Sequence, residues 1–83
     1  MSLGKILEIW RHPRNGRVVL RDMGQHSTVG VRFYRVNRNT AYDVTVVASL
    51  TAARTGLEKW GYALDPTATR QAKAYEDKKP RKP

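Results

Sequence analysis

The hydrophobic pattern of the chain changes its period near Ser49, and this change restricts the folds that the chain can adopt. Before Ser49, apolar and polar residues alternate in short runs, which is typical of strands with one buried face. After Ser49, apolar residues recur at intervals of three and four, as on one face of an α-helix. The length of 83 residues suits one small domain. The pattern therefore predicts an α+β fold, in which a small antiparallel sheet is followed by one packed helix.

Four segments carry the alternating pattern, and the connections between them are short. The pair Asn15-Gly16 lies in the first connection and tolerates the positive φ angles of a tight hairpin turn. Short connections favour antiparallel neighbours, so the sheet is expected to be a meander of about four strands. The expected strands are residues 5–11, 17–22, 29–36 and 41–48.

The expected helix runs from about residue 50 to residue 60. Ser49 precedes it as a cap that can accept a backbone N–H bond. Gly61 follows at the position where a glycine with positive φ commonly ends a helix. Gly56 in its interior is expected to allow a close approach to the sheet.

Residues 1–65 are expected to form this single α+β domain. The pair Asp65-Pro66 resembles a cap followed by proline at the first helical position, which predicts a marginal second helix over residues 67–77. The remaining residues, up to Pro83, form a basic, proline-broken segment that is expected to be a flexible tail.

The core is expected to consist of the inward-facing residues of the strands and of the helix. Trp10 is expected in the core or at its edge, as tryptophans usually pack. The other residues of the expected core are Ile6 or Leu7, Ile9, Val18, Leu20, Val29, Val31, Phe33, Val44, Val46, Leu57 and Trp60.

The chain is strongly basic, with 16 lysine and arginine residues against 7 acidic ones and a formal net charge of +9. Residues 1–65 and 66–83 both carry a positive excess, so the charge does not come from the end of the chain alone. Arginine dominates residues 1–65, and its planar fork of donors suits phosphate and stacks on flat rings. A purely solvating surface would contain more lysine and glutamate.

Strand alternation places Arg32 and Tyr34 on the sheet face that the helix does not cover. Such a face could bind nucleic acid or an acidic protein surface. It could also be only the polar outer face of a two-layer domain. The residues expected to contact a partner are Arg17, Arg21, Arg32, Tyr34, Arg35 and Arg38. Further contacts are expected from the tail residues Lys78, Lys79, Arg81 and Lys82.

The sequence contains no catalytic signature, and we expect no enzyme, cofactor or metal. There is no cysteine, and the two histidines, His12 and His26, lie beside different turns. A histidine pair could cleave RNA by acid–base catalysis, but nothing in the sequence brings these two together. No apolar run approaches the roughly 20 residues of a membrane span, and no signal peptide is evident at the start of the chain. A cytoplasmic protein is therefore expected.

The junction at residues 44–54, Val-Thr-Val-Val-Ala-Ser-Leu-Thr-Ala-Ala-Arg, resembles the strand–turn–helix step of several small DNA-binding domains. Examples are the arm-binding domains of phage integrases and the plant ethylene-response-factor domains, in which the sheet lies in the major groove. The resemblance is architectural and covers about residues 17–60. A similar junction occurs in small phage proteins that inhibit host defence or transcription complexes. No family is assigned on this basis.

Two functions follow from these observations. The first is a small non-enzymatic module that binds DNA or RNA through an arginine-rich sheet face. The second is a small phage-type inhibitor or adaptor that docks its basic face on a larger protein or nucleoprotein assembly. An exposed edge strand could also pair two copies as a homodimer.

Overall fold

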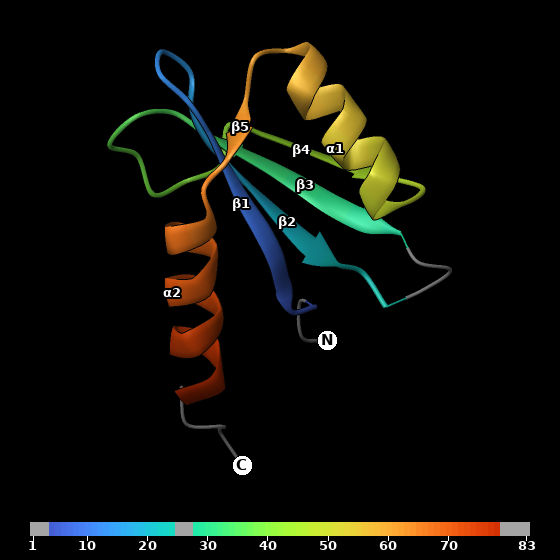
Figure 1. The fold of residues 1–83 in the computed structure, drawn as a ribbon, viewed down its shortest axis with the longest axis vertical. Helices are drawn as coiled ribbons and strands as arrows, with labels where there is room; N and C mark the ends of the chain where they lie inside the picture. Colours follow the sequence, from blue (N-terminus) through green and yellow to red (C-terminus); the bar gives the residue numbers. More distant parts are fainter. Residues whose placement is uncertain (1–3, 25–27, 79–83) are drawn as a thin grey trace.

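The computed structural model describes residues 4–24 and 28–78, and for residues 77–78 it describes only the backbone. In this part of the chain, five strands and two helices follow one another (Figure 1). They are β1 (Ile6–His12), β2 (Gly16–Asp22), β3 (Val29–Tyr34), β4 (Asp43–Val47), α1 (Leu50–Lys59), β5 (Ala63–Leu64) and α2 (Pro66–Lys78).

The strands form one antiparallel sheet in the order β4-β3-β2-β1-β5. The predicted α+β class is confirmed, but the sheet has one strand more than expected. The additional strand, β5, has only two residues, which is too short to produce an alternating pattern. Neither helix is long and apolar enough to cross a lipid bilayer in the part of the chain described.

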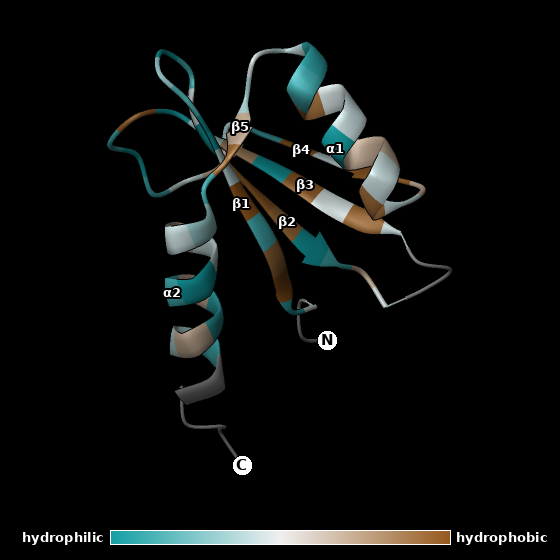
Figure 2. Cartoon of the chain, viewed as in Figure 1, coloured by the Kyte–Doolittle hydropathy of each residue, from teal (hydrophilic) through white to brown (hydrophobic). Residues whose placement is uncertain are grey.

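Helix α1 covers one face of the sheet and closes the core against it. Hydrophobic residues are concentrated in the central strands and on the helix side that faces them, whereas the hairpin tip is hydrophilic (Figure 2). The partly buried Leu7, Phe33, Val47 and Leu50 pack around the buried cluster. The buried cluster consists of Trp10, Val18, Leu20, Val29, Val31, Ala53, Leu57 and Tyr62.

Three residues of the expected core lie outside it. Val44 and Val46 are 55% and 54% exposed, because β4 pairs with β3 in the opposite phase from the one expected. Thr45 is the cross-strand partner of the buried Val31, so Thr45 and Val47 take the helix-covered face. Trp60 is 74% exposed at the C-terminal cap of α1, which ends at Lys59.

The predicted ends of α1 are confirmed. The Ser49 hydroxyl accepts a hydrogen bond from the Ala52 backbone N–H at 3.1 Å, and Gly61 has a φ angle of 88°. The expected close approach at Gly56 is wrong. No atom of the sheet or of another side chain lies within 4 Å of the position that a Cβ atom would occupy there.

Helix α2 begins at the predicted place and lies along β1 (Figure 1). The Asp65 carboxylate caps it by accepting the Ala68 backbone N–H at 2.9 Å, and this hydrogen bond, followed by the Arg11 ion pair, lowers the pKa of Asp65.

Side chains of α2 also bind the backbone of β1. The Thr69 hydroxyl accepts the backbone N–H of Ile9 at 2.9 Å, and the Glu76 carboxylate accepts that of Ile6 at 3.1 Å. Side chains of α2 therefore occupy donors of β1 that a further strand would otherwise use. The expected tail beyond Lys78 lies outside the described residues.

Glu8 is the one charged residue among the buried residues described, and it connects β1 to α1. Its carboxylate accepts hydrogen bonds from the Arg54 guanidinium and from the Trp10 indole N–H, the latter at 3.0 Å. Burial opposes the charge of Glu8, but these hydrogen bonds outweigh it and lower its pKa. The Glu8 carboxylate thus links α1 to strand β1 of the sheet.

Candidate nucleic-acid interface

Two arginines and a tyrosine form a row across the three central strands. Arg11 of β1 is the cross-strand partner of Arg17 of β2, and Arg17 is the partner of Tyr34 of β3. Residues directly opposite each other in an antiparallel sheet point to the same side. The three side chains therefore lie on the face opposite α1, at the end of the sheet that carries the β1–β2 and β3–β4 connections.

Two of the arginines at this end lie over tyrosine rings. The Arg17 guanidinium carbon is 4.4 Å from the centroid of the Tyr34 ring, and that of Arg35 is 4.6 Å from the centroid of Tyr42. Such contacts hold a guanidinium over the ring while its N–H edge can still donate hydrogen bonds. An Arg17 N–H also donates to the Arg38 carbonyl at 3.2 Å, which ties β2 to the β3–β4 loop.

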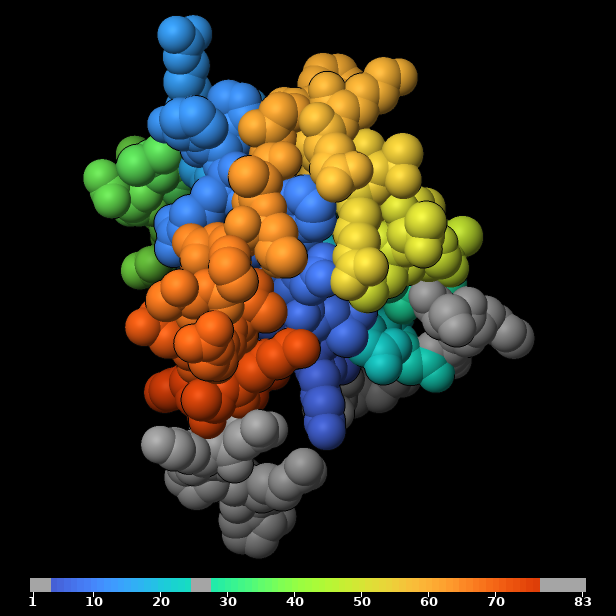
Figure 3. Space-filling model, in the orientation of Figure 1, coloured from blue at the N-terminus to red at the C-terminus, as the bar shows by residue number. Residues whose placement is uncertain are grey.

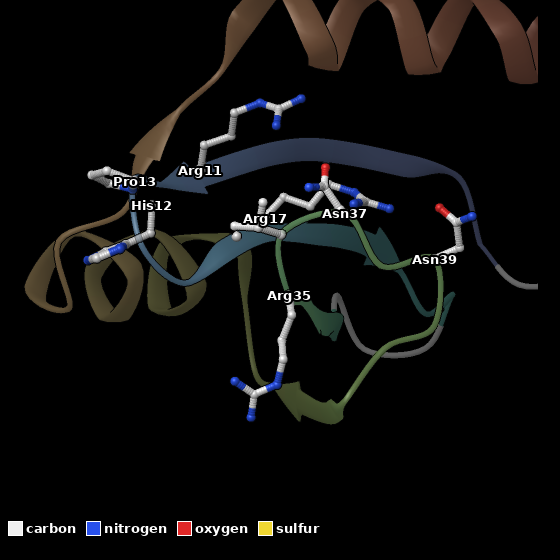
Figure 4. Close-up of a pocket in the computed structure, with 9 residues that line it drawn as sticks. Arg11, His12, Pro13, Arg17, Arg35, Asn37 and Asn39 are labelled. Carbon is white, nitrogen blue, oxygen red and sulfur yellow. The ribbon is translucent and has the colours of Figure 1, made fainter.

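An open pocket of about 550 Å³ lies between the hairpin and the β3–β4 loop (Figure 4). A second hollow of about 600 Å³ adjoins it along the same loop and adds Arg38 and Tyr42. Figure 4 shows that Arg35 points away from Arg11 and Arg17, so the arginines surround the loop and do not converge on one point. The first pocket is lined by Arg11, His12, Pro13, Gly16, Arg17, Arg35, Val36, Asn37 and Asn39.

One glycine and one asparagine determine the backbone conformation at this end of the sheet. Gly16 has a φ angle of 108°, and a Cβ atom there would lie 2.1 Å from the Tyr34 carbonyl oxygen, so only glycine fits. Asn37 has a φ angle of 62°, in the left-handed region that asparagine tolerates. The sequence-based expectation of a turn at Asn15-Gly16 is confirmed. We refer to Arg11, Arg17, Arg35, Asn37, Arg38 and Asn39 as the basic loop end.

Carboxylates of the described residues lie mostly elsewhere. No carboxylate lines either pocket, and the three ion pairs of the described residues are Glu8–Arg54, Arg21–Glu76 and Arg11–Asp65. Arg11 is therefore partly neutralised, whereas Arg17, Arg35 and Arg38 form no ion pair within the described part of the chain. Their positive charges are available to an anionic partner.

The structure brings together only some of the residues that the sequence indicated. Arg17, Tyr34, Arg35 and Arg38 meet at the basic loop end, and Arg32 lies further along the same face as Tyr34. Arg21 lies toward the other end of β2, where it donates to the Glu76 carboxylate at 3.1 Å and to the Gly4 carbonyl at 2.9 Å. Arg21 therefore binds α2 and Gly4 to the sheet. The expected tail contacts Lys79, Arg81 and Lys82, and the side chain of Lys78, lie outside the described residues.

The rest of the face opposite α1 combines Arg21 and Arg32 with apolar residues. Ile9 and Val19 are cross-strand partners and both are buried. Val44 is the partner of Arg32 and, like Val46, is exposed. Arg21 is paired with Glu76, so the unpaired arginines of this face away from the basic loop end are reduced to Arg32 among the described residues.

His12 belongs to the hairpin turn. Its Nδ1 atom accepts the backbone N–H of Arg14 at 3.0 Å and that of Asn15 at 3.2 Å, and its ring lies 5.1 Å from the Tyr62 ring. His26 lies outside the described residues. Among the residues described, no three histidine, aspartate or glutamate side chains are grouped as ligands of a metal ion.

The sequence-based search missed Arg11, Asn37 and Asn39 as members of this site. In a four-stranded meander the first and third connections lie at the same end of the sheet, and this relation could have identified all three. No family model, curated protein or solved structure matches the chain, so the resemblance to small DNA-binding domains stays an expectation.

Proposed function

We propose that the protein is a non-enzymatic module that binds nucleic acid by its phosphate backbone through the basic loop end. The observation that carries this proposal is that Arg17, Arg35 and Arg38 lie at one end of the sheet and form no ion pair within the described part of the chain. A polyanion that lies across this end would pair with all three guanidinium groups, and the net charge of +9 would attract it.

Binding of this kind depends little on base sequence. Guanidinium groups and amides donate hydrogen bonds to phosphate oxygens, and such contacts position a nucleic acid without reading its sequence. The rings of Tyr34 and Tyr42 already carry arginines, so they support phosphate contacts. Each phosphate that is neutralised releases counterions, so affinity should fall steeply with salt.

Fluorescence anisotropy with labelled single-stranded DNA, duplex DNA and RNA tests the proposal at low salt and over a salt titration. The Arg17→Ala/Arg38→Ala variant should bind more weakly than the wild type. It should lose about 0.9 of the slope of log K against log salt for each duplex phosphate contact that is removed.

The Lys5→Ala variant is the charge control, because Lys5 is exposed and precedes β1 at the opposite end of that strand from the hairpin. It should keep most of the affinity and the slope. Absence of binding to all three polymers by the wild type, or equal binding by the double arginine variant, would refute the proposal.

An apolar surface favours docking on a protein assembly as the second candidate, as in a phage-type inhibitor or adaptor. Exposed Val44 and Val46 lie on β4, and Met23 lies over Gly30, the cross-strand partner of Val46. A phosphate backbone does not require this surface. A Val44→Thr/Val46→Thr variant should keep nucleic-acid binding under the first proposal and lose a captured protein partner under the second.

A further inference from the structure

Trp60 is the most exposed large hydrophobic side chain in the described part of the protein. It is the residue that caps the C-terminal end of α1, and its backbone N–H is bonded within the helix. The other tryptophan, Trp10, is 4% exposed and belongs to the core. Helix capping does not require an indole, so the fold alone does not explain the side chain of Trp60.

Trp60 lies at the same end of the molecule as the basic loop end. The next residue, Gly61, lies close to His12: a Cβ atom placed on Gly61 would be 3.4 Å from the imidazole ring. His12 in turn lines the pocket that contains Arg11 and Arg17. In Figure 3 the end of α1 (light orange) and the β1–β2 hairpin (light blue) both project from this end of the molecule.

We infer that Trp60 is a base-stacking platform and that the nucleic acid bound at the basic loop end is single-stranded. This inference rests on the proposed function. Phosphates lie against the arginines of the face opposite α1, and the strand passes around the hairpin end of the sheet, so that an unpaired base stacks on the exposed indole on the α1 side. The inference extends the site from a purely electrostatic surface to one that distinguishes single strands from duplexes.

The chemistry of the neighbouring rings supports a single strand. Tyr34 and Tyr42 each present one ring face to an arginine, whereas no stacking partner is present on Trp60 among the described residues. Bases expose their flat faces only in unpaired strands, where they stack on aromatic side chains. In a duplex, these faces are covered by neighbouring base pairs.

Anisotropy measurements on three probes test the inference: an oligothymidylate, an oligouridylate, and a DNA duplex with the same number of phosphates. Trp60→Ala should bind the two single strands about 5- to 150-fold more weakly than the wild type, the range expected for the loss of one stacked base. Its affinity for the duplex should be unchanged. Trp60→Phe should retain much of the single-strand affinity, and Tyr75→Ala, which removes a ring that is 68% exposed on α2, should retain all of it.

Tryptophan fluorescence provides a second readout. Oligothymidylate should quench the emission of the wild type but not that of Trp60→Phe, in which the buried Trp10 is the remaining indole. Equal single-strand affinity of Trp60→Ala and wild type, absence of quenching, or an equal loss of duplex affinity would each overturn the inference. The proposed function would survive those results if the wild type still binds with the expected salt dependence. Failure of the wild type to bind any probe would reject both.

Discussion

Arg17 of β2 lies over the ring of Tyr34 of β3, with its guanidinium carbon 4.4 Å from the ring centroid. The two residues are direct cross-strand partners, so the sheet itself sets this stacking. The sequence suggested Tyr34 as a residue that contacts the partner directly. In the structure, the Arg17 guanidinium covers one face of its ring, so under the proposed function Tyr34 would hold an arginine.

Substitution of Tyr34 should therefore affect binding through Arg17. Tyr34→Leu should weaken nucleic-acid binding by about two- to five-fold, the value expected for the loss of an exposed cation–π contact. Tyr34→Phe keeps the ring and should bind as the wild type does. Anisotropy at one fixed salt concentration compares the variants, and a similar loss in both would point to the hydroxyl group instead of the ring.

The ion pair of Glu8 with Arg54 should make stability depend on pH. The pKa of Glu8 is lowered in the folded protein, so the charged form stabilises the fold above the ordinary value of 4.5, and this contribution is lost as the pH falls through the folded value. Glu8→Gln should lower the free energy of unfolding at pH 7 by about 1–2 kcal/mol. The difference from the wild type should shrink in acid.

Urea unfolding at a series of pH values measures this difference. Asp43→Asn, an exposed substitution on β4, is the control and should follow the wild-type curve. A constant gap between Glu8→Gln and the wild type over the whole series would show that the charge of Glu8 does not contribute.

Gly56 offers a stabilising substitution. It lies inside α1, and its Cβ position has open space around it. Alanine loses less backbone entropy than glycine in a helix, so Gly56→Ala should raise the free energy of unfolding by about 0.5–1 kcal/mol. Thermal and urea unfolding test this, and a lower midpoint would mean that α1 packs more closely than described.

Leu57 in the last turn of α1 and Trp60 at its C-cap should differ in how much their truncation to alanine lowers the free energy of unfolding. Leu57 is buried in the core, so Leu57→Ala should cost about 2–5 kcal/mol. Trp60 is exposed, so Trp60→Ala should change stability by no more than about 0.5 kcal/mol. Chemical unfolding of both variants checks the assignment, and comparable losses would place Trp60 in the core after all.

The central strands, both ends of α1 and the start of α2 could be predicted from the sequence because local chemistry determines them. Ser49, Gly61 and Asp65-Pro66 act on the backbone next to them. The phase of β4 could not be predicted. Val44 and Val46 share one face and Thr45 and Val47 the other, so both faces contain valine, and the pairing with β3 decides which face is buried.

The candidate site was predictable only in part for a similar reason. The arginine bias of the first strands identified Arg17, Arg35 and Arg38. Arg21, like Arg17, is an arginine of β2. It pairs with Glu76 of α2, which lies 55 residues further along the chain. Long-range pairing of this kind leaves no local signal in the sequence.

The contacts between α2 and β1 also limit how this sheet can grow. One side of the sheet ends in β5, which has two residues, and in a stretch of β1 whose donors are taken by Thr69 and Glu76. The other side ends in β4, which has a strand neighbour on one side only in the part of the chain described. If two copies joined through β4, both long open edges would be used, so strand addition would stop at a pair and would not propagate into a fibre.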